Sequence, residues 1–293
     1  MMKCSAIILA YNERLHIQRC VENVRRVAQE VFVVDCHSTD GTQEIARACG
    51  ATVVEHDWPG NQAEQLNWAL ENLPITGDWV LRQDADEYLS EELIQEINGR
   101  VGRLEPAVTG VAYTFDVVFQ GKRLRFGPRR PEILRLWRRG KARCEKRIMD
   151  ERMVLLEGEA ISFGGRFVDH NLNDLDWWTR KHLGYAKREM AQAAIAIWGQ
   201  RGHGRANQGV YYRLPIFWRA TAYFLYRYVV RLGFLDGKAG FVWHFFQGWW
   251  YRALVDAKLM EMYRSAGVTG GGITTSWLHD YLKEQGISLP EDF

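Results

Sequence analysis

The chain has 293 residues, of which 47% are hydrophobic and 25% are charged, so the composition excludes a disordered polypeptide and predicts a globular protein with a sizeable core. Residues 1–100 contain 8 Lys and Arg against 17 Asp and Glu, a net charge of −9. Because the whole chain carries +2, the remaining residues carry +11. An acidic first third and a basic remainder predict different partners for the two parts.

The distribution of cysteines and the length of the apolar runs argue against two further classes of protein, disulfide-rich proteins and proteins with membrane-spanning helices. The 5 cysteines are scattered and never form a C-x-x-C pair, which indicates neither a disulfide framework nor a zinc site and favours a reducing compartment. The apolar run near the N-terminus passes directly into polar residues, so it is expected to be a strand and not a signal peptide. No run reaches the roughly eighteen charge-free apolar residues that spanning a bilayer requires.

Short apolar strands alternate with helical patterns through the first 104 residues. Strands are expected near 4–10, 30–35, 51–57 and 77–84, and helices near 14–27, 43–50, 61–73 and 90–104. This alternation predicts βαβ units and a mainly parallel α/β sheet with helices on both faces. Ligands bind beyond the carboxyl ends of such strands, and the polar groups there are "YNE", "DCHSTD" and "DADE".

The pattern of apolar and charged residues changes after Pro106. A hairpin-like pair of strands is expected within 110–124, and between Lys122 and Arg152 the sequence holds 13 Lys and Arg against 4 Asp and Glu. A long helix follows at 173–200. We therefore divide the chain into a first domain, 1–170, with parts 1–100 and 101–170, and a helical C-terminal region, 171–293.

Three carboxylates follow the fourth strand within four positions: Asp84, Asp86 and Glu87. Carboxylates this close repel one another, so the expected partner is a divalent cation with oxygen ligands, Mg²⁺ or Mn²⁺, completed by the phosphates of a nucleotide diphosphate. The alternative is that Asp86 and Glu87 only begin the next helix, where acidic side chains favour the positive end of the helix dipole.

The segments "AIILAYNE", "VVDCHSTDGT" and "RQDADEYL", in this order and spacing, resemble an inverting family 2 glycosyltransferase of the GT-A fold. The later segments "FVDHNLNDLDWWTRKHLGYAKRE" and "GFLDGKAGFVWHFFQGWWYR" resemble bacterial members that build lipopolysaccharide cores and exopolysaccharides. The resemblance implies transfer of a sugar, with inversion, from a nucleotide-diphosphate sugar to a glycan hydroxyl. It makes 1–170 the GT-A catalytic domain, with 1–100 as the nucleotide-sugar-binding part and 101–170 as the acceptor part.

The resemblance also implies roles for individual residues. It places Ala10, Tyr11 and Glu13 beside the base and ribose, and Asp35 in a hydrogen bond to the base, for which uracil offers an imide N–H. A chain with Asp-Cys here departs from the common pair of aspartates, which weakens the choice of uracil over guanine. The resemblance further implies that Asn67 reaches the donor, the alternative being a surface amide. It also implies that Asp84 lies at the ribose or donor sugar and that Asp86 binds the metal.

A general base must take the proton of the acceptor hydroxyl. The acidic pair in the basic middle section is Asp150-Glu151, and the resemblance makes one of them the base, with Glu151 preferred; the alternative is that both balance neighbouring arginines. His170 is a candidate metal ligand, although an isolated histidine is more often a packing residue.

Basic and aromatic residues are interleaved from Val210 to Arg264. This pattern predicts a membrane-interface segment and a lipid-linked acceptor, either polyprenyl-diphosphate-linked or lipid A-core, at the cytoplasmic face of the inner membrane. The alternative is a helical pair packed on the catalytic domain or on a second subunit. Two rival functions are a nucleotidyltransferase, disfavoured because no glycine-rich loop follows the first strand, and a nucleic-acid-binding module, disfavoured by the acidic first third.

Overall fold

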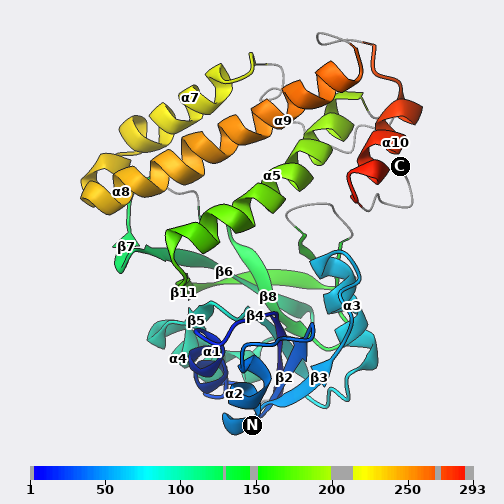
Figure 1. The fold of residues 1–293 in the computed structure, drawn as a ribbon. Helices are drawn as coiled ribbons and strands as arrows, with labels where there is room; N and C mark the ends of the chain where they lie inside the picture. The colour runs from blue at the N-terminus through cyan, green and yellow to red at the C-terminus, as the bar shows by residue number, and fades with distance from the viewer. Residues whose placement is uncertain (1–2, 128–129, 146–150, 199–213, 268–271, 288–293) are drawn as a thin grey trace. The chain divides into compact units, whose positions relative to one another are not determined.

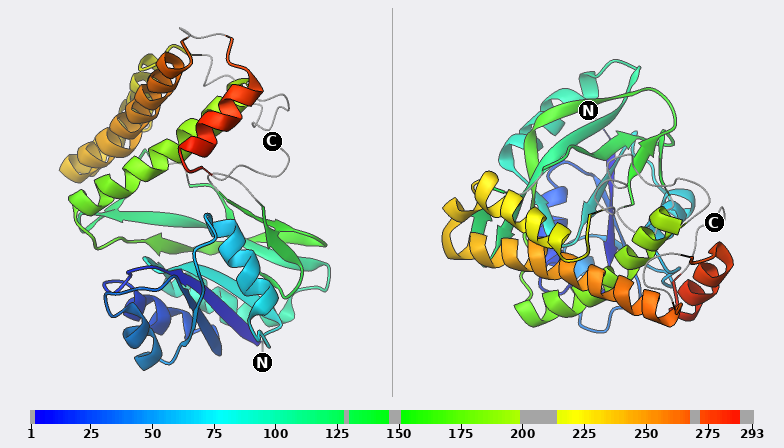
Figure 2. Two further views of the ribbon diagram at one scale, coloured as in Figure 1. Left: turned by 45° about the vertical axis from the view of Figure 1, so that its right-hand side comes forward. Right: turned by 90° about the horizontal axis from the view of Figure 1, so that it is seen from above.

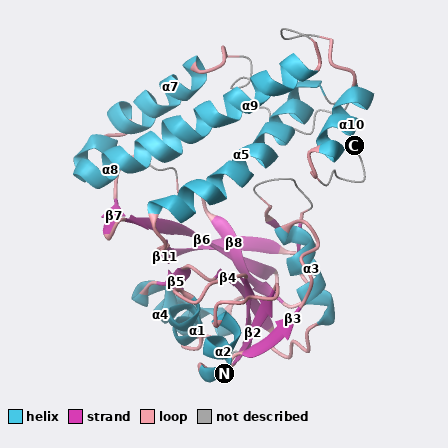
Figure 3. Ribbon diagram, viewed as in Figure 1, coloured by secondary structure: helices cyan, strands magenta, loops and turns pink. Residues whose placement is uncertain are grey.

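The computed structural model describes residues 3–127, 130–145, 151–198, 214–267 and 272–287. The described residues fall into two units. The first lies within Met1–Arg123, Arg129–Lys146 and Glu151–Asn173, and the second within Leu124–Pro128, Arg147–Asp150 and Asp174–Phe293. Figure 3 shows the strands gathered in the first unit, whereas the second unit is built from helices.

A mixed sheet organises the first unit. Its described strands run in the order β3-β2-β1-β4-β8-β6-β11-β5, with β7 paired to β6. All neighbours from β3 to β4 are parallel, β8 is antiparallel to both β4 and β6, β11 is parallel to β6, and β5 is antiparallel to β11. The bounds are β1 Cys4–Ala10, β2 Glu30–Asp35, β3 Thr52–Glu55, β4 Trp79–Asp84, β5 Glu87–Leu89, β6 Val108–Phe119, β7 Lys122–Leu124, β8 Ile133–Arg138 and β11 Glu159–Asp169. A separate hairpin pairs β9 (Ala142–Cys144) with β10 (Met153–Leu155).

Capping residues explain where the helices of this unit begin. Asn61 accepts a hydrogen bond from the backbone of Glu64, and Ser90 accepts one from Leu93, as N-cap side chains do. The helices are α1 (Ile17–Val24), α2 (Thr42–Ala48), α3 (Gln62–Asn72), α4 (Glu91–Arg100) and the short 3₁₀ turn η1 (Val101–Arg103).

Two apolar clusters cover opposite faces of the sheet. One packs α1, α2 and α4 against residues such as Ile8 and Leu81, while the other packs α3 and the β9–β10 hairpin against residues such as Ile7 and Val80. Neighbouring strand residues thus alternate between the clusters, as the pleat requires. Figure 1 shows α3 apart from α1, α2 and α4, so the predicted α/β class with helices on both faces is confirmed.

The second unit has its own apolar cluster, formed by α5, α9 and α10. Figure 2 shows α9 lying along α5. Buried within the unit, Arg219 and Asp256 form an ion pair, and Asp256 also accepts the backbone N–H of Phe217 at 2.8 Å. The elements are α5 Leu175–Trp198, α7 Trp218–Leu225, η2 Tyr226–Val230, η3 Gly233–Asp236, α8 Gly237–Trp243, η4 His244–Trp250, α9 Tyr251–Ser265 and α10 Thr275–Glu284. Within the described ranges, no helix is both long enough and apolar enough to cross a bilayer.

The elements expected from the sequence are present, including β6 and β7 as a hairpin and α5 as a long helix. One alternative for the acidic cluster is wrong. Glu87 belongs to strand β5, and α4 begins later, after its N-cap Ser90, so Asp86 and Glu87 do not begin that helix.

Candidate functional site

The carboxyl ends of three parallel strands meet at one edge of the sheet. In the strand register Ala10 lies opposite Asp35, and Leu9 lies opposite Asp84. Tyr11 follows β1 directly and is 61% exposed, whereas Ala10 is buried. The sequence prediction that these segments converge on one edge is therefore confirmed for their backbone.

Arginine side chains lie against two of the three clustered carboxylates. Arg135, which is buried on β8, contacts Asp84 Oδ2 at 3.2 Å and Glu87 Oε1 at 2.8 Å. Arg82 contacts the other oxygen of Asp84 at 3.4 Å. Glu87 also accepts hydrogen bonds from Gln83 Nε2 and from the backbone of Asp84. The repulsion expected within this cluster is thus offset largely by guanidinium groups.

The environment pushes the pKa values of these two carboxyls apart. Burial alone would raise the pKa of Asp84, but Arg135 and Arg82 hold it well below its usual range. Burial raises the pKa of Glu87, the charges of Asp84 and Asp86 add to that rise, and Arg135 opposes it. Asp84 therefore stays anionic. Glu87 is buried and holds the turn between β4 and β5 by accepting the backbone N–H of Asp84.

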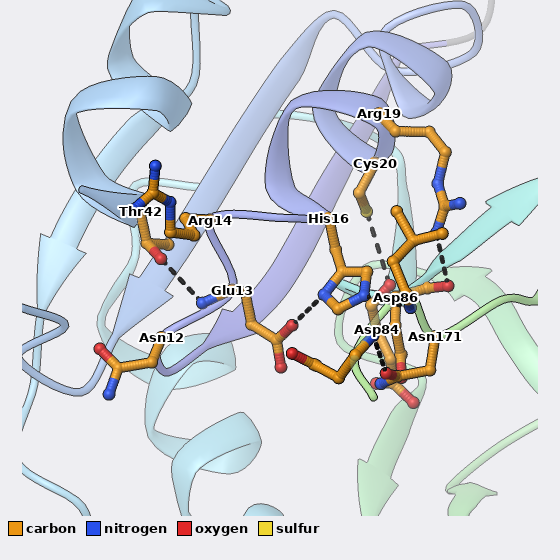
Figure 4. A network of polar contacts seen from close by, with 12 residues as sticks. Asn12, Glu13, Arg14, His16, Arg19, Cys20, Thr42, Asp84, Asp86 and Asn171 are labelled. Atoms are coloured by element: carbon orange, nitrogen blue, oxygen red, sulfur yellow. Dashed lines mark hydrogen bonds and ion pairs between the residues drawn. The ribbon is translucent and has the colours of Figure 1, made fainter. Parts of the chain in front are cut away.

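Asp86 lies beside the end of β11. Its Oδ2 accepts a hydrogen bond from Asn171 Nδ2 at 2.9 Å, and its backbone carbonyl accepts one from the N–H of His170 at 3.0 Å (Figure 4). Its other oxygen, Oδ1, has no hydrogen-bond partner within the described part of the chain. Asp86 is thus the acidic side chain of the cluster that keeps an oxygen for a ligand.

Arg19 on α1 fixes the position of His170. Its guanidinium donates to the backbone carbonyls of Asp86 and His170, at 3.0 and 2.7 Å, and to Nδ1 of the His170 ring at 3.2 Å. An arginine can only donate, so Nδ1 of His170 is the acceptor and Nε2 carries the hydrogen. Burial, followed by the charge of Arg19, lowers the pKa of His170. In this arrangement Nδ1 of the His170 ring is occupied by Arg19, and the role of His170 as a metal ligand stays a prediction.

His16 joins the first turn to the end of β11. Its Nδ1 lies 2.6 Å from Glu13 Oε2, and its Nε2 accepts the backbone N–H of Leu172 at 2.8 Å. Because Nε2 accepts, Nδ1 carries the hydrogen and donates it to Glu13. Figure 4 shows Glu13 and His16 pointing toward one another, and the Thr42 hydroxyl accepting the backbone N–H of Glu13 at 2.8 Å. The carboxylate of Glu13 is therefore held in one orientation.

Asp35 is fully buried and acts within its own turn. Its carboxylate accepts hydrogen bonds from the backbone and the hydroxyl of Ser38, at 2.8 and 2.6 Å, and from Gln43 Nε2 at 2.7 Å. With these three donors and no exposed surface, Asp35 does not face a ligand in this structure. The expected direct hydrogen bond to a base is not the role that this geometry supports.

Asn67 is also buried, and it is neither a surface amide nor open to the donor. Its Nδ2 donates to the carbonyl of Cys144, and its Oδ1 accepts the N–H of Cys144, each at 2.9 Å. The side chain thus ties α3 to the β9–β10 hairpin, which corrects both expectations for this residue. The correction matters because Glu151 lies two residues before Met153, the first residue of β10 in the same hairpin.

Electrostatics bring Glu151 into the neighbourhood of Asp84. Burial raises the pKa of the Cys144 thiol to about 11, Arg82 opposes this shift, and Glu151, Glu145 and Asp84 add to it. The thiol is thus within electrostatic reach of Asp84 and of both glutamates of this hairpin. Glu151 is half-buried, and Asp150, the other member of the pair, lies outside the described residues.

The model of the family described as "Glycosyl transferase family 2" matches residues 5–153, about half of the chain and the part that contains these strand ends. The chain belongs to glycosyl transferase family 2. Its fold is the mixed α/β GT-A class that the sequence predicted.

Curated relatives share parts of this family 2 chain. An uncharacterized glycosyltransferase of Rickettsia bellii is 42% identical over 95 residues, which cover 32% of this chain and 31% of the relative. The lipopolysaccharide core biosynthesis glycosyltransferase LpsC of Rhizobium meliloti is 32% identical over 160 residues, which cover 48% of this chain and 53% of LpsC. The chain thus spans about a third to a half of the length of these relatives.

The chain is also similar in part to solved structures. Glucosyl-3-phosphoglycerate synthase from Mycobacterium tuberculosis, in complex with Mn²⁺, UDP and glucosyl-3-phosphoglycerate, is 25% identical, with 39% of this chain and 44% of that chain covered and a TM-score of 0.32. Mannosyl-3-phosphoglycerate synthase from Rubrobacter xylanophilus is 23% identical, with 39% and 40% covered and a TM-score of 0.34.

The sequence analysis did not identify four residues that hold the site together: His16, Arg19, Arg135 and Asn171. Only Arg135 had a signal, because it interrupts the apolar strand "ILRLW" and so must point a charge into the protein. No group of three or more His, Cys, Asp or Glu side chains is placed to hold a metal ion among the described residues.

Proposed function

We propose that the protein transfers a sugar, with inversion, from a nucleotide-diphosphate sugar to a hydroxyl of a lipid-linked glycan acceptor. The observation that carries this proposal is the alignment of Tyr11, Asp84 and Asp86 at one edge of the sheet in a family 2 chain. In parallel α/β sheets this edge is where ligands bind.

The donor would lie over the turn after β1. Tyr11 is exposed and can contact the base, and the carboxylate of Glu13 is oriented by His16. Asp84 stays anionic and is 31% exposed, so it can accept hydrogen bonds from hydroxyl groups of the ribose or donor sugar. We assign Asp35 to shaping the turn beside the base. Because its carboxylate is buried, Asp35 supplies no reason to prefer uracil over guanine.

A divalent cation, Mg²⁺ or Mn²⁺, fits Asp86 best among the candidate ligands. Asp86 keeps one carboxylate oxygen open, whereas His170 faces Arg19. When bound there with the diphosphate, the cation would supply Lewis-acid stabilisation of the charge on the departing nucleoside diphosphate. Asn171 would orient the Asp86 carboxylate through its hydrogen bond to Oδ2.

Glu151 is our candidate for the general base, with Asp150 the alternative. The support is its place beside β10, in the hairpin that Asn67 ties to α3, and its electrostatic influence on the same thiol as Asp84. A carboxylate there can take the proton of an acceptor hydroxyl that approaches the donor from the hairpin side.

An exposed apolar segment in the second unit supports an acceptor in a lipid surface. We call residues 225–241 the apolar turn; it comprises the end of α7, η2, η3 and most of α8. Its exposed large side chains are Leu225, Tyr226, Val229, Val230, Leu232, Phe234, Leu235 and Phe241. So many neighbouring exposed apolar residues mark an interaction surface.

Charge and backbone conformation in the apolar turn favour an anionic lipid surface as the partner. Arg231 and Lys238 are exposed, whereas the acidic residue, Asp236, is buried and accepts the backbone N–H groups of Arg125 and Phe126. Leu232 adopts the left-handed backbone conformation, with φ of 60°, which costs a leucine about 1–2 kcal/mol relative to glycine. A leucine that stays exposed despite this conformational cost is consistent with a side chain that inserts into lipid.

These features suggest peripheral association with the cytoplasmic face of the inner membrane. A role in lipopolysaccharide or another surface polysaccharide is supported by the 32% identity to LpsC over 160 residues. Both the membrane and the biosynthetic role belong to the proposal, as does the choice between a polyprenyl-diphosphate-linked and a lipid A-core acceptor.

Calorimetric titration of the purified protein with UDP and with GDP, each with and without Mn²⁺ and in detergent, tests the donor site. We expect one nucleotide to bind in a metal-dependent manner. If neither binds under any condition, the acidic cluster is only a structural ion-pair network and the proposed donor site is wrong.

A further inference from the structure

Three arginines converge on one buried aspartate in the first unit. Asp116 on β6 is 1% exposed, and it forms ion pairs with Arg123, with Arg130 Nη1 at 3.1 Å and with Arg166 Nη1 at 3.2 Å. One guanidinium group would suffice to neutralise one carboxylate. Arg123 and Arg166 alone already bring two positive charges to this one carboxylate, and we call Asp116 and the three arginines the arginine cluster.

The arginine cluster has more donors than Asp116 can accept. The guanidinium groups of Arg123 and Arg166 together offer about ten N–H donors, whereas a carboxylate has about four lone-pair sites. The side chains of Arg123 and Arg166 are 56% and 39% exposed, so their remaining donors can reach a ligand in solution. Guanidinium forks held in place by a shared carboxylate are suited to a phosphoryl group, which they can bind in a bidentate manner.

Strand register places the arginine cluster relative to the candidate site. Across three neighbouring strands, Tyr88 of β5 lies opposite Val168 of β11, and Val168 lies opposite Asp116 of β6. Two strand spacings separate Tyr88 from Asp116, about 10 Å. Asp86 is two residues before Tyr88 and bonds through its carbonyl to His170, two residues after Val168. The arginine cluster therefore lies near the same edge of the sheet as Asp86, but not next to it.

The pleat also fixes the face on which the arginine cluster lies. Phe115 packs with the α1 and α4 side of the sheet, so its neighbour Asp116 points to the opposite face. Gly110, an even number of residues earlier on β6, approaches Leu155 of β10. The arginine cluster thus shares a face with the hairpin that carries Glu151.

We propose that the arginine cluster binds a phosphoryl group of the acceptor. This inference rests on the proposed function, in which an acceptor approaches from the hairpin face. The same chemistry could serve the diphosphate of the donor. The arginine cluster lies two strand spacings from β5, the strand that follows Asp86. This distance favours the acceptor as the source of the phosphoryl group, because the donor diphosphate is expected at Asp86 itself.

Titration of the full chain with inorganic phosphate and with pyrophosphate, monitored by calorimetry, tests this site without relying on transfer. The titrations are made alone and after saturation with UDP and Mn²⁺, with wild type, Arg123→Gln, Arg166→Gln and the control Arg26→Gln. Arg26 is a similarly exposed arginine on the α1 side, paired with Glu91. We expect each cluster variant to weaken binding about tenfold or more, and Arg26→Gln to bind as wild type does.

The titrations with and without UDP distinguish the two sources of the phosphoryl group, the acceptor and the donor. Binding that persists in the presence of UDP assigns the arginine cluster to the acceptor. Binding that UDP abolishes would assign it to the donor diphosphate and overturn the proposal. No binding to wild type, or equal weakening in Arg26→Gln, would leave the cluster as charge compensation for Asp116. Failure of UDP itself to bind would instead count against the proposed donor site, since the titrations without nucleotide still decide whether the cluster binds phosphate.

Discussion

His16 and Leu172 are 156 positions apart in the chain, yet the backbone N–H of Leu172 donates to Nε2 of His16 over 2.8 Å. Because the other ring nitrogen is bonded to Glu13, this buried imidazole couples the turn after β1 to the segment after β11. Two loops of the candidate site are thereby held by one side chain, and Arg19 reinforces the link through the carbonyls of Asp86 and His170.

Replacing His16 with Phe should keep the packing but remove both hydrogen bonds. The N–H of Leu172 and the carboxylate of Glu13 would lose their partners, so we expect a loss of about 2 kcal/mol or more in the free energy of unfolding. Urea denaturation measures this loss, and hydrogen exchange should show the Leu172 amide exchanging faster. His16→Gln keeps a donor and an acceptor and should recover part of the loss. Wild-type stability in His16→Phe would contradict the coupling.

Asp84 should make stability depend on pH. Its pKa in the folded state is held below the ordinary value of about 4 by Arg135 and Arg82, so its contribution is present above that value and is lost as the pH falls through the folded pKa. The difference in unfolding free energy between wild type and Asp84→Asn should therefore be constant above about pH 5 and shrink below about pH 4. Urea denaturation from pH 7 to pH 3 measures it, with Asp57→Asn, whose side chain is 95% exposed, as the control. A difference that stays constant or grows in acid would show that Asp84 is not stabilised by these arginines.

The fold could be predicted from the sequence because its signals are local. β-branched runs such as "EVFVVD" and caps such as Asn61 and Ser90 act within a few residues, and the order of strands and helices then fixes the sheet edge at which Ala10, Asp35 and Asp84 end.

The partners of the site residues could not be predicted in the same way. They depend on the pairing of β5 with β11 and of Asn67 with Cys144, which join segments far apart in sequence. A carboxylate or amide that reads as a ligand contact can equally serve the backbone, as Asp35 and Asn67 do. Arg135 was missed as well, although a charge inside an apolar strand needs a buried partner and so gave a signal that could have been used.

Asp86→Ala should abolish transfer while leaving the fold intact. The substitution removes the carboxylate with an open oxygen and no core contact, so we expect the rate to fall by at least about 100-fold and Mn²⁺-dependent nucleotide binding to be lost. Transfer assays and calorimetry with UDP and GDP measure the two effects, and Asp57→Ala is the matched exposed control. Normal transfer by Asp86→Ala in the presence of Mn²⁺ would rule out the proposed metal ligand.

Glu151→Gln should separate donor binding from chemistry. The amide cannot take a proton, so kcat should fall by about 10²–10⁴-fold while nucleotide affinity stays at the wild-type value. Glu145→Gln, in the same hairpin, is the control and should transfer normally. An unchanged kcat in Glu151→Gln would move the role of base to Asp150 or to another residue.

The apolar turn should govern binding to lipid. Val230 and Leu235 are 68% and 51% exposed, so replacing both with Gln should leave the fold unchanged and remove apolar surface that would enter the interface. Loss of two such side chains should weaken co-sedimentation with vesicles of phosphatidylcholine and phosphatidylglycerol about tenfold or more. Binding should also fall as salt rises, because Arg231 and Lys238 would face anionic headgroups. Leu183→Gln, at a leucine of α5 that is 46% exposed, is the matched control. Equal binding by wild type and the double variant, or equal weakening by Leu183→Gln, would mean that the apolar turn packs against another protein or serves another role. The proposal of a lipid-linked acceptor would then lose its structural support.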